Sequence, residues 1–477
     1  MRVIGKLGIA AGALFAVAQL VRPVIPAKPA TAEIQAAPAV KQILNKSCYS
    51  CHSDERRLAW FDQIEPAYLL VRHDILNARS HLNFSTLGSA SPAVQRAKLF
   101  EAVNMIQLGA MPLHQFVALH PDARVSPEEL AELKAYLAPW GTVPSSPSNK
   151  KKGDGQPASG GEAAATPISL SAVQPERNGL AFDPSFESWK LISTTDRGDN
   201  NTFRFILGND IAVKAAQSGN ISPWPDGTRF AKVAWQQELG EGGLIHPGKF
   251  VQVELMVKDA RRYKDTDGWG WGRWRGLDLK PYGGDAHFVS ECTSCHLPVR
   301  GNDYVYTLPI TTAHVNREQI VNNPAASLPA SLPLRPLAWR ALTMYVDLKA
   351  RTTAALYGND AAMQVVNARG PAAGTQPPSY PAGAVLALVT WSRRNDPHWF
   401  GARIPDTPLT VEFVQISSGK GADFYRVFEG RTLVEAHPDA KEAAQRTNFI
   451  LNLKPACLPQ SRVNQEKENI NEANSSR

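Results

Sequence analysis

Two copies of the pattern Cys-x-x-Cys-His are the residues of this sequence best suited to chemistry. They run from Cys48 to His52 and from Cys292 to His296, and they use four of the five cysteines in 477 residues. Two thiols at this spacing can form thioethers to one porphyrin, and the adjacent imidazole can bind its iron. A disulfide or half of a zinc site would leave the histidine at the same offset in both copies unexplained. The sequence therefore predicts two covalently bound c-type haems, attached through Cys48, Cys51, Cys292 and Cys295, with His52 and His296 as iron ligands.

The N-terminus has the features of an export signal. Arg2 and Lys6 precede an uncharged, mostly apolar run from Leu7 to Val21, and Arg22 follows it. Such a run is a secretory signal or a short uncleaved membrane anchor, and the stretch from Ala30 to Ala37 offers only weak cleavage sites. Haem is attached to this cysteine pattern in exported chains, so the leader and the two patterns agree. We expect a periplasmic protein, exported by its N-terminal signal and either released or anchored to the inner membrane.

The net charge of +7 and the isoelectric point near 9.1 point to acidic partners. The basic residues are spread along the chain, and their only tight cluster runs from Lys150 to Lys152. Nucleic acid is therefore not an expected partner. A basic periplasmic haem protein is better suited to an acidic redox partner, such as a small cytochrome, or to an anionic membrane surface.

The first part of the chain is predicted to be helical. Apolar residues recur at helical spacing in four segments, and Ser126 begins a capping box with proline at the first helical position. These segments are residues 39–46, 65–79, 92–106 and 127–136. From about residue 144 to residue 166 the chain is rich in Ser, Pro, Lys, Gly and Ala, which predicts a flexible linker. We therefore expect a signal or anchor over 1–30, a helical haem domain over 31–142 and a linker over 143–178.

The second half is predicted to be rich in β-strands and to contain an internal repeat. Period-two alternation marks strands over residues 230–235, 250–257 and 304–308. The spacing from Trp189 to Gly208-Asn209-Asp210 recurs from Trp339 to Gly358-Asn359-Asp360, and two further motifs recur in the same order. The repeat predicts two copies of one β-domain, over 179–320 and 321–458, followed by a disordered tail over 459–477. The second copy lacks the Cys-x-x-Cys-His pattern and has only Cys457 near its end, so it should carry no haem.

In the first domain, Met111 is the candidate for the second axial ligand of the iron. It stands beside a proline in the loop from Gly109 to Pro112, before the helix that follows Ser126. Ligation by histidine and methionine raises the reduction potential and closes the iron to substrates, which suits electron transfer. The competing ligands are His73, His81, His114 and His120.

Two stretches of the chain resemble known families. Residues 47–53, Trp60, residues 64–66 and residues 81–85 resemble the small haem-binding domain of exported bacterial proteins, which implies one c-type haem over about residues 35–140. Residues 181–318 resemble cytochrome P-460 and its relative cytochrome c-prime-beta. The motifs that carry this second resemblance are Pro225-Asp226-Gly227-Thr228, Val253-Glu254, Asp267-Gly268-Trp269-Gly270-Trp271, Cys292 to His296, and Asp303-Tyr304-Val305-Tyr306-Thr307.

The second resemblance implies a small β-sheet protein with one haem, which has a histidine on one face of the iron and an open site on the other. In cytochromes P-460 a lysine is bonded to the haem ring and the iron oxidises hydroxylamine. The c-prime-beta members instead bind nitric oxide, with aromatic side chains crowding the open face. The expected fold class is therefore α+β multidomain, with an N-terminal helical c-type haem domain and then two β-rich cytochrome P-460-like domains, the second without haem.

Lys232 matches the lysine that is bonded to haem in cytochromes P-460. It follows the Pro-Asp-Gly turn by five residues, and strand alternation places it on one face with Phe230 and Ala234. The haemless repeat has Leu388 at the equivalent position, so the charge is absent where the haem is absent.

Oxidation of hydroxylamine also requires a proton acceptor near the open side of the iron. His287 is the candidate base, because an imidazole titrates near neutral pH, and Glu291 and Asp285 are the alternatives. The resemblance implies a carboxylate in this role, so a histidine would depart from the family. Three tryptophans should pack around the haem or in the domain interior, namely Trp269, Trp271 and Trp274.

Three functions are compatible with these residues. The first is oxidation of hydroxylamine, or conversion of nitric oxide, at the second haem, with electrons relayed through the first haem as a tethered acceptor. The second is capture of nitric oxide without turnover. The third is electron transfer by both haems, which requires a sixth protein ligand at the second haem, such as Met256 or His246. The haemless repeat could pair with the haem domain as a pseudo-dimer, because relatives of this fold tend to be homodimers.

Overall fold

The computed structural model describes residues 13–20, 22–55, 57–138, 170–310, 323–368, 378–417, 424–456 and 458–459. The chain divides into two compact units, Met1–Trp140 and Gly141–Arg477, which we call the N-terminal and C-terminal units. Most of the predicted linker, most of the predicted tail and Cys457 lie outside the described residues.

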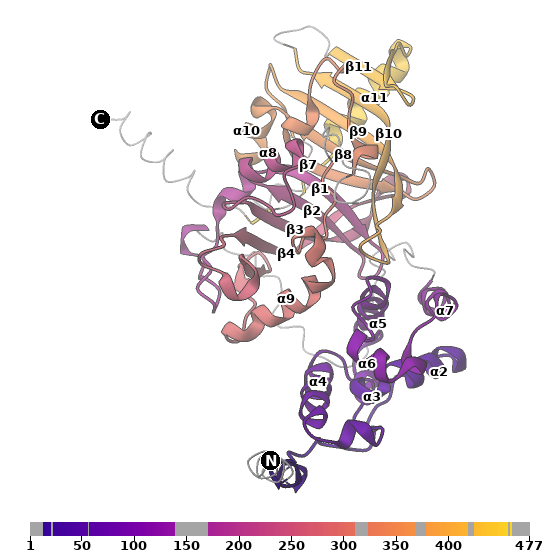
Figure 1. The fold of residues 1–477 in the computed structure, drawn as a ribbon. Helices are drawn as coiled ribbons and strands as arrows, with labels where there is room; N and C mark the ends of the chain where they lie inside the picture. Colours follow the sequence, from indigo (N-terminus) through magenta and orange to yellow (C-terminus); the bar gives the residue numbers. More distant parts are fainter. Residues whose placement is uncertain are drawn as a thin grey trace, which may run out of the picture. The chain divides into compact units, whose positions relative to one another are not determined.

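The N-terminal unit is helical, as predicted (Figure 1). The four predicted segments are helices α2 (Pro38–Ser47), α4 (Ala67–His81), α5 (Pro92–Gln107) and α7 (Pro127–Leu137), and between them lie the short helices α3 (Tyr49–His52) and α6 (His114–Leu119). Helix α7 begins with the predicted capping box, in which the side chains of Ser126 and Glu129 each accept from the other's backbone amide. The core of this unit is built from apolar side chains of α2, α5 and α7, including Val40, Leu44, Phe100, Val103, Leu133 and Leu137.

The segment before α2 is packed onto this unit. Ile25 and Ile34 are both buried, and the Tyr68 hydroxyl on α4 donates to the Pro23 carbonyl at 2.8 Å. The amide of Ala32 donates to the Ser85 carbonyl at 3.0 Å. The predicted boundary between residues 30 and 31 therefore falls inside folded structure. Among the described residues, no helix is both long enough and apolar enough to span a bilayer.

The C-terminal unit contains one antiparallel sheet built from two copies of a strand–strand–helix–strand–strand unit (Figure 1). The first copy consists of β1 (Lys190–Arg197), β2 (Thr202–Gly208), α8 (Asp210–Ser218), β3 (Arg229–Leu239) and β4 (Leu244–Lys258). The second copy consists of β7 (Arg340–Asp347), β8 (Thr352–Gly358), α10 (Asp360–Ala368), β9 (Val385–Asn395) and β10 (Ala402–Gln415). The sheet is extended by β5 (Trp269–Arg275) and β6 (Lys280–Pro281) in the first copy and by β11 (Phe424–Glu429) and β12 (Val434–Ala436) in the second.

Both copies of the strand–strand–helix–strand–strand unit use the Gly-Asn-Asp motif in the same way. Asn209 accepts from the Ala212 amide at the start of α8, and its amide group donates to the Gly227 carbonyl at 2.8 Å. Asn359 accepts from the start of α10 in the same way, and it donates to the Gly383 carbonyl at 3.0 Å. Both glycines have positive φ angles, +84° and +82°, which explains why each turn has glycine there.

The two copies form a single closed sheet. Strand β10 pairs with β1 at Ala402 and Arg197, and β4 pairs with β7 at Leu244 and Asp347, so each copy closes on the other in the same manner. Side chains of both copies share one interior, which includes Phe205, Trp235, Val253, Met344, Trp391 and Val411. The predicted boundary at residues 320 and 321 lies outside the described residues, and the copies on either side of it are two halves of one sheet.

The outer face of each copy is covered by different helices. In the first copy, α8 and the cysteine-bearing helix α9 (Val289–His296) flank a cluster that contains Ile206, Phe230 and Trp271. In the second copy, Ile450 of α11 (Ala440–Asn452) packs with Leu388 on the equivalent face. The predicted alternation on β3 is confirmed, because Phe230 belongs to the outer cluster while Ala231, Val233 and Trp235 belong to the interior.

The last part of the predicted linker is ordered against the C-terminal unit. Leu170 is buried in the interior, and the buried carboxylate of Glu176 accepts from the backbone amides of Arg273, Tyr282 and Gly283 at 2.9 to 3.1 Å. A buried carboxylate that accepts from three backbone amides is fixed in position, so residues 170–178 are held against this unit and do not act as a linker.

Candidate functional site

The second Cys-x-x-Cys-His pattern lies on α9, which ends at His296. Cys292 is half-buried and packs against the outer cluster of the first copy. The His296 Nδ1 donates to the Tyr304 carbonyl at 2.7 Å, which fixes the ring and leaves Nε2 as the nitrogen that can bind iron. Burial lowers the pKa of His296 to about 4, so the imidazole is neutral at physiological pH, as a metal ligand must be. The rings of Trp271 and Tyr306 lie 4.5 and 5.1 Å from it, centroid to centroid.

The carbonyl that holds His296 comes from a strained turn. Asp303 and Tyr304 have φ angles of +47° and +65°, in the left-handed region that non-glycine residues seldom adopt. Asp303 is fixed by an ion pair with Lys258 at 2.8 Å and by the backbone amide of Trp224 at 2.8 Å. The predicted strand over residues 304–308 is therefore wrong, because these residues pair with no strand and present a carbonyl to His296.

We expect Lys258→Ala to destabilise the C-terminal unit by about 3 kcal/mol, because it leaves the Asp303 carboxylate buried without its cation. The two side chains are only 7 % and 10 % exposed. Lys280→Ala is the matched control, since Lys280 pairs with Asp278 at the same 2.8 Å but with side chains 79 % and 47 % exposed. Urea unfolding, followed by tryptophan fluorescence, gives the stability of both variants and of the wild type. Equal midpoints for Lys258→Ala and Lys280→Ala would show that the ion pair between Lys258 and Asp303 does not stabilise the unit.

A row of charged side chains crosses the outer face beside α9. Lys232 on β3 is directly opposite Glu254 on β4, which is in turn opposite Arg273 on β5. The Lys232 Nζ lies 2.5 Å from a Glu254 oxygen, and the Arg273 Nε lies 3.3 Å from the other oxygen. The Lys232 and Glu254 side chains are 26 % and 16 % exposed, so the pair is largely removed from water.

The electrostatics of this row connect it to the cysteine pattern. Burial lowers the pKa of Lys232 to about 8, against the opposing effect of Glu254. Burial would raise the pKa of Glu254, but Lys232 and Arg273 hold it well below its ordinary value, so the carboxylate is ionised. The charges of Lys232, Glu254 and Arg273 all act on the pKa of His296 as well. Lys232, Glu254 and Arg273 thus lie within electrostatic range of His296.

The predicted bases lie elsewhere. His287 is exposed, and its backbone amide donates to Asp285, which is also exposed. Glu291 is exposed and accepts from the Tyr282 hydroxyl at 2.9 Å. No contact joins these three side chains to Lys232 among the described residues, although the charge of Glu291 acts on the pKa of Arg273. The carboxylate found beside Lys232 is Glu254, which the sequence marked only as part of the Val253-Glu254 motif and not as a base.

The remaining predicted side chains divide between the two faces. Trp269 and Trp271 belong to the outer cluster with Met256, whereas Trp274 is in the interior. His246 packs against Tyr345 of the second copy, with ring centroids 5.9 Å apart, and therefore lies with the other outer face.

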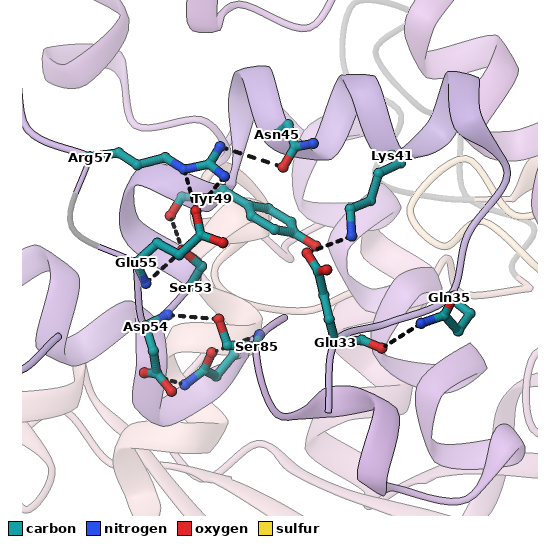
Figure 2. A network of polar contacts seen from close by, with 11 residues as sticks. Glu33, Gln35, Lys41, Asn45, Tyr49, Ser53, Asp54, Glu55, Arg57 and Ser85 are labelled. Carbon is teal, nitrogen blue, oxygen red and sulfur yellow. Dashed lines mark hydrogen bonds and ion pairs between the residues drawn. The ribbon is translucent and has the colours of Figure 1, made fainter. Parts of the chain in front are cut away.

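The first Cys-x-x-Cys-His pattern is held in the same manner as the second. The His52 Nδ1 donates to the Leu82 carbonyl at 2.9 Å, and the Phe84 amide donates to the His52 carbonyl at 2.8 Å. Tyr49, inside the pattern, is fully buried and stacks on Phe84 at 5.3 Å. Lys41 and Arg57 lie over the Tyr49 ring and are themselves paired with acidic side chains (Figure 2). The cysteines are thus presented on a rigid support.

Both sites have the donors that a haem requires. In the N-terminal unit, the Arg79 Nε and Nη2 atoms are buried without a hydrogen-bond partner among the described residues, and the charge of Arg79 acts on the pKa of Cys51. In the C-terminal unit the same is true of the Arg204 Nε and the Trp271 Nε1 atoms. Burial raises the pKa of Cys48 and of Cys292 to about 12, which suits the uncharged sulfur of a thioether. The residues present therefore fit a haem at each pattern, with propionates as acceptors for the arginines.

The candidates for the sixth ligand of the first haem differ in their surroundings. Met111 is half-buried in the turn between α5 and α6. His120 has both ring nitrogens in use, with the Phe116 carbonyl and with Asp62, each at 3.1 Å. His73 and His114 are exposed, and the His81 Nδ1 interacts with the Asn77 carbonyl at 2.9 Å. Ligation by Met111 stays a prediction.

Comparison with protein-family models agrees with both predicted resemblances. Residues 184–307 match the model described as cytochrome P460, and residues 10–139 match the model described as a haem-binding domain. The chain joins a haem-binding domain to a cytochrome P460 domain. No curated protein is similar enough to the chain to count as a match. The cytochrome P460 domain contains β1 to β6 and α9, so it includes the Lys232–Glu254 pair, while the second copy lies outside both matched ranges.

Proposed function

We propose that this chain is an exported dihaem c-type cytochrome whose cytochrome P460 domain oxidises hydroxylamine. Electrons would pass to the haem of the N-terminal domain and then to a periplasmic acceptor such as a small cytochrome. The observation that carries the proposal is the Lys232–Glu254 pair, 2.5 Å apart, beside the cysteine pattern that ends at His296. An ionised carboxylate at a haem site can act as the proton acceptor that hydroxylamine oxidation requires, and the lysine is the one that the resemblance to cytochromes P-460 implies.

Glu254 is the proposed proton acceptor. A haem held by Cys292, Cys295 and His296 would supply the iron that accepts the electrons. Every N–H and O–H bond of hydroxylamine must break on the way to nitric oxide, and each proton needs an acceptor within hydrogen-bond reach. Arg273 and Lys232 fix the Glu254 carboxylate in one orientation and keep it ionised.

Lys232 would tune this base. While its amine carries a positive charge, it lowers the pKa of Glu254 and makes the carboxylate a weak base. A bond from the Lys232 nitrogen to the porphyrin ring would replace one N–H and one ring C–H bond, with two electrons passing to an external two-electron oxidant. The product is a neutral secondary amine, so most of that charge would be removed. The basicity of Glu254 would then rise toward that of an ordinary carboxylate, so the cross-link and the proton transfer support each other.

The proposal is tested on the purified protein with both haems. We expect two haems per chain, and nitric oxide formation from hydroxylamine when an artificial electron acceptor is present. Cys292→Ser/Cys295→Ser should keep one haem and lose this activity. Cys48→Ser/Cys51→Ser should also keep one haem, yet still turn over with the artificial acceptor. If Cys48→Ser/Cys51→Ser loses the activity and Cys292→Ser/Cys295→Ser keeps it, the assignment of the site is overturned.

Nitric oxide binding without turnover is the second candidate. An aromatic patch favours it, since Phe230 stacks on Trp269 at 6.1 Å in the outer cluster of the first copy. The charged row formed by Lys232, Glu254 and Arg273 is the feature that a passive gas binder does not need. A haem that binds nitric oxide and leaves hydroxylamine unchanged would favour this second function.

We further propose that the second copy carries no haem and serves as the partner of the first copy in a pseudo-dimer. Glu412 occupies the position of Glu254, opposite Leu388 in place of Lys232. The Glu412 carboxylate is paired with Arg446 of α11, through two contacts of 2.7 Å. Helix α11 therefore fills the face that would otherwise accept a ring, as the burial of Ile450 indicates.

We also propose that the protein is exported and keeps its N-terminal segment as an anchor at the inner membrane. Cleavage between Ala30 and Ala37 would remove Ile25 from its buried site against Tyr68 and Ile75. We therefore expect the purified protein to retain residues before Ile25, which a mass measurement of the intact chain will show. A mature N-terminus between residues 31 and 38 would contradict this, and it would imply that the unit folds without the segment.

A further inference from the structure

The second copy contacts the polypeptide directly behind His296. The loop between β9 and β10, residues 396–401, reaches the segment that follows the haem-binding helix of the first copy. The His398 Nδ1 donates to the Tyr306 carbonyl at 2.7 Å, and the Trp399 ring lies against the Tyr306 ring at 5.4 Å. The hydrogen bond joins residues 92 positions apart, so a repeat that should carry no haem touches the haem site of its neighbour.

Tyr306 contacts both the loop of the second copy and the cysteine pattern. Its ring lies edge-on to the His296 ring, with centroids 5.1 Å apart and planes at 79°. Its hydroxyl donates to the Cys295 carbonyl at 2.6 Å. The orientation of the imidazole is thus set from two sides, by the Tyr304 carbonyl at Nδ1 and by the Tyr306 ring at its edge.

The loop is fixed in position by both copies. Within the loop, the Asp396 carboxylate accepts from the His398 backbone amide at 2.8 Å. The Gly198 amide of the first copy donates to the Gly401 carbonyl at 2.8 Å. The Arg197 guanidinium lies over the Trp399 ring at 4.1 Å and is paired with Asp199, and both of these charged side chains are buried. A loop held this firmly can act as a rigid support.

We propose that the second copy acts as a built-in positioning subunit for the haem ligand of the first, with His398 as the positioning residue. This rests on the proposed haem attachment at residues 292–296. Groups that orient a metal-bound histidine from behind set its alignment with the metal, and their loss typically changes activity or metal affinity by 10- to 100-fold. The second copy would therefore have been retained because it orients the iron ligand of the first copy, and not because it binds a haem itself.

His398→Ala tests the proposal in the full-length protein with both haems. We expect haem content to stay complete, the ferrous iron–histidine stretching band of the five-coordinate haem to shift, and kcat for hydroxylamine to fall about tenfold with KM unchanged. His398→Asn should restore the wild-type band, because its amide N–H can occupy the place of Nδ1–H. His437→Ala is the control, since His437 is an exposed histidine of the same copy.

Two outcomes are decisive. If His398→Ala loads haem and leaves the stretching band unchanged, the proposal is overturned. If that variant does not fold, Trp399→Leu replaces it and should shift the band in the same way, and an unchanged band there overturns the proposal equally. The band requires only haem at His296, so a protein that shows the shift but does not oxidise hydroxylamine would refute the proposed activity and leave the positioning role intact.

Discussion

Glu254→Gln is expected to reduce hydroxylamine oxidation by about a hundredfold or more, because it removes the proton acceptor while keeping the shape of the side chain. Glutamine cannot take up a proton, but it still fits between Lys232 and Arg273. Haem content and nitric oxide binding should therefore remain close to wild type. Steady-state kinetics with an artificial acceptor measure the loss, and a nitric oxide titration of the same sample measures the retained site.

The controls for this prediction are the other groups near α9. Glu291→Gln and His287→Ala change exposed side chains that do not contact the Lys232–Glu254 pair. Both variants should turn over at the wild-type rate. If His287→Ala loses activity and Glu254→Gln does not, the base is the histidine that the sequence suggested, and Glu254 is then only the counter-ion of Lys232.

Lys232→Ala is expected to have the largest spectroscopic effect. A haem with a nitrogen bonded to its ring should absorb to the red of an ordinary c-type haem, and the variant should lose that shift. Turnover should fall about tenfold or more, since the variant changes the haem itself and frees one side of Glu254. Absorption spectra of the reduced proteins give the shift, and mass spectrometry of the haem peptide gives the cross-link.

Lys214→Ala is the matched control for this second prediction, because Lys214 is an exposed lysine on α8 of the same copy. It should preserve both the spectrum and the rate. A red-shifted spectrum that survives in Lys232→Ala would mean that the shift has another origin, and Lys232 would then be a partner of Glu254 and nothing more.

Much of the local structure could be predicted from the sequence. The helices of the N-terminal unit follow from apolar spacing and from the Ser126 capping box, which act within a few residues of the chain. The placement of Lys232 followed from strand alternation after the glycine turn, again a local effect. The repeat was visible because the Gly-Asn-Asp motif makes the same hydrogen bonds in both copies.

The parts that could not be predicted depend on contacts between distant residues. Closure of the sheet rests on two short pairings, at Arg197 with Ala402 and at Leu244 with Asp347, and neither has a sequence signal. The strand predicted over residues 304–308 failed because its turn presents a carbonyl to His296. Glu254 was missed because a carboxylate opposite a lysine becomes recognisable only when the register of β3 and β4 is known.

The most direct test of the central claim is to add hydroxylamine, with an electron acceptor and without oxygen, to the oxidised protein that carries both haems. We expect repeated turnover to nitric oxide, together with a Soret band of the reduced protein that lies well to the red of an ordinary c-type haem. An ordinary high-spin spectrum, with nitric oxide binding but no oxidation of hydroxylamine, would contradict the account and make this cytochrome P460 domain a gas-binding one.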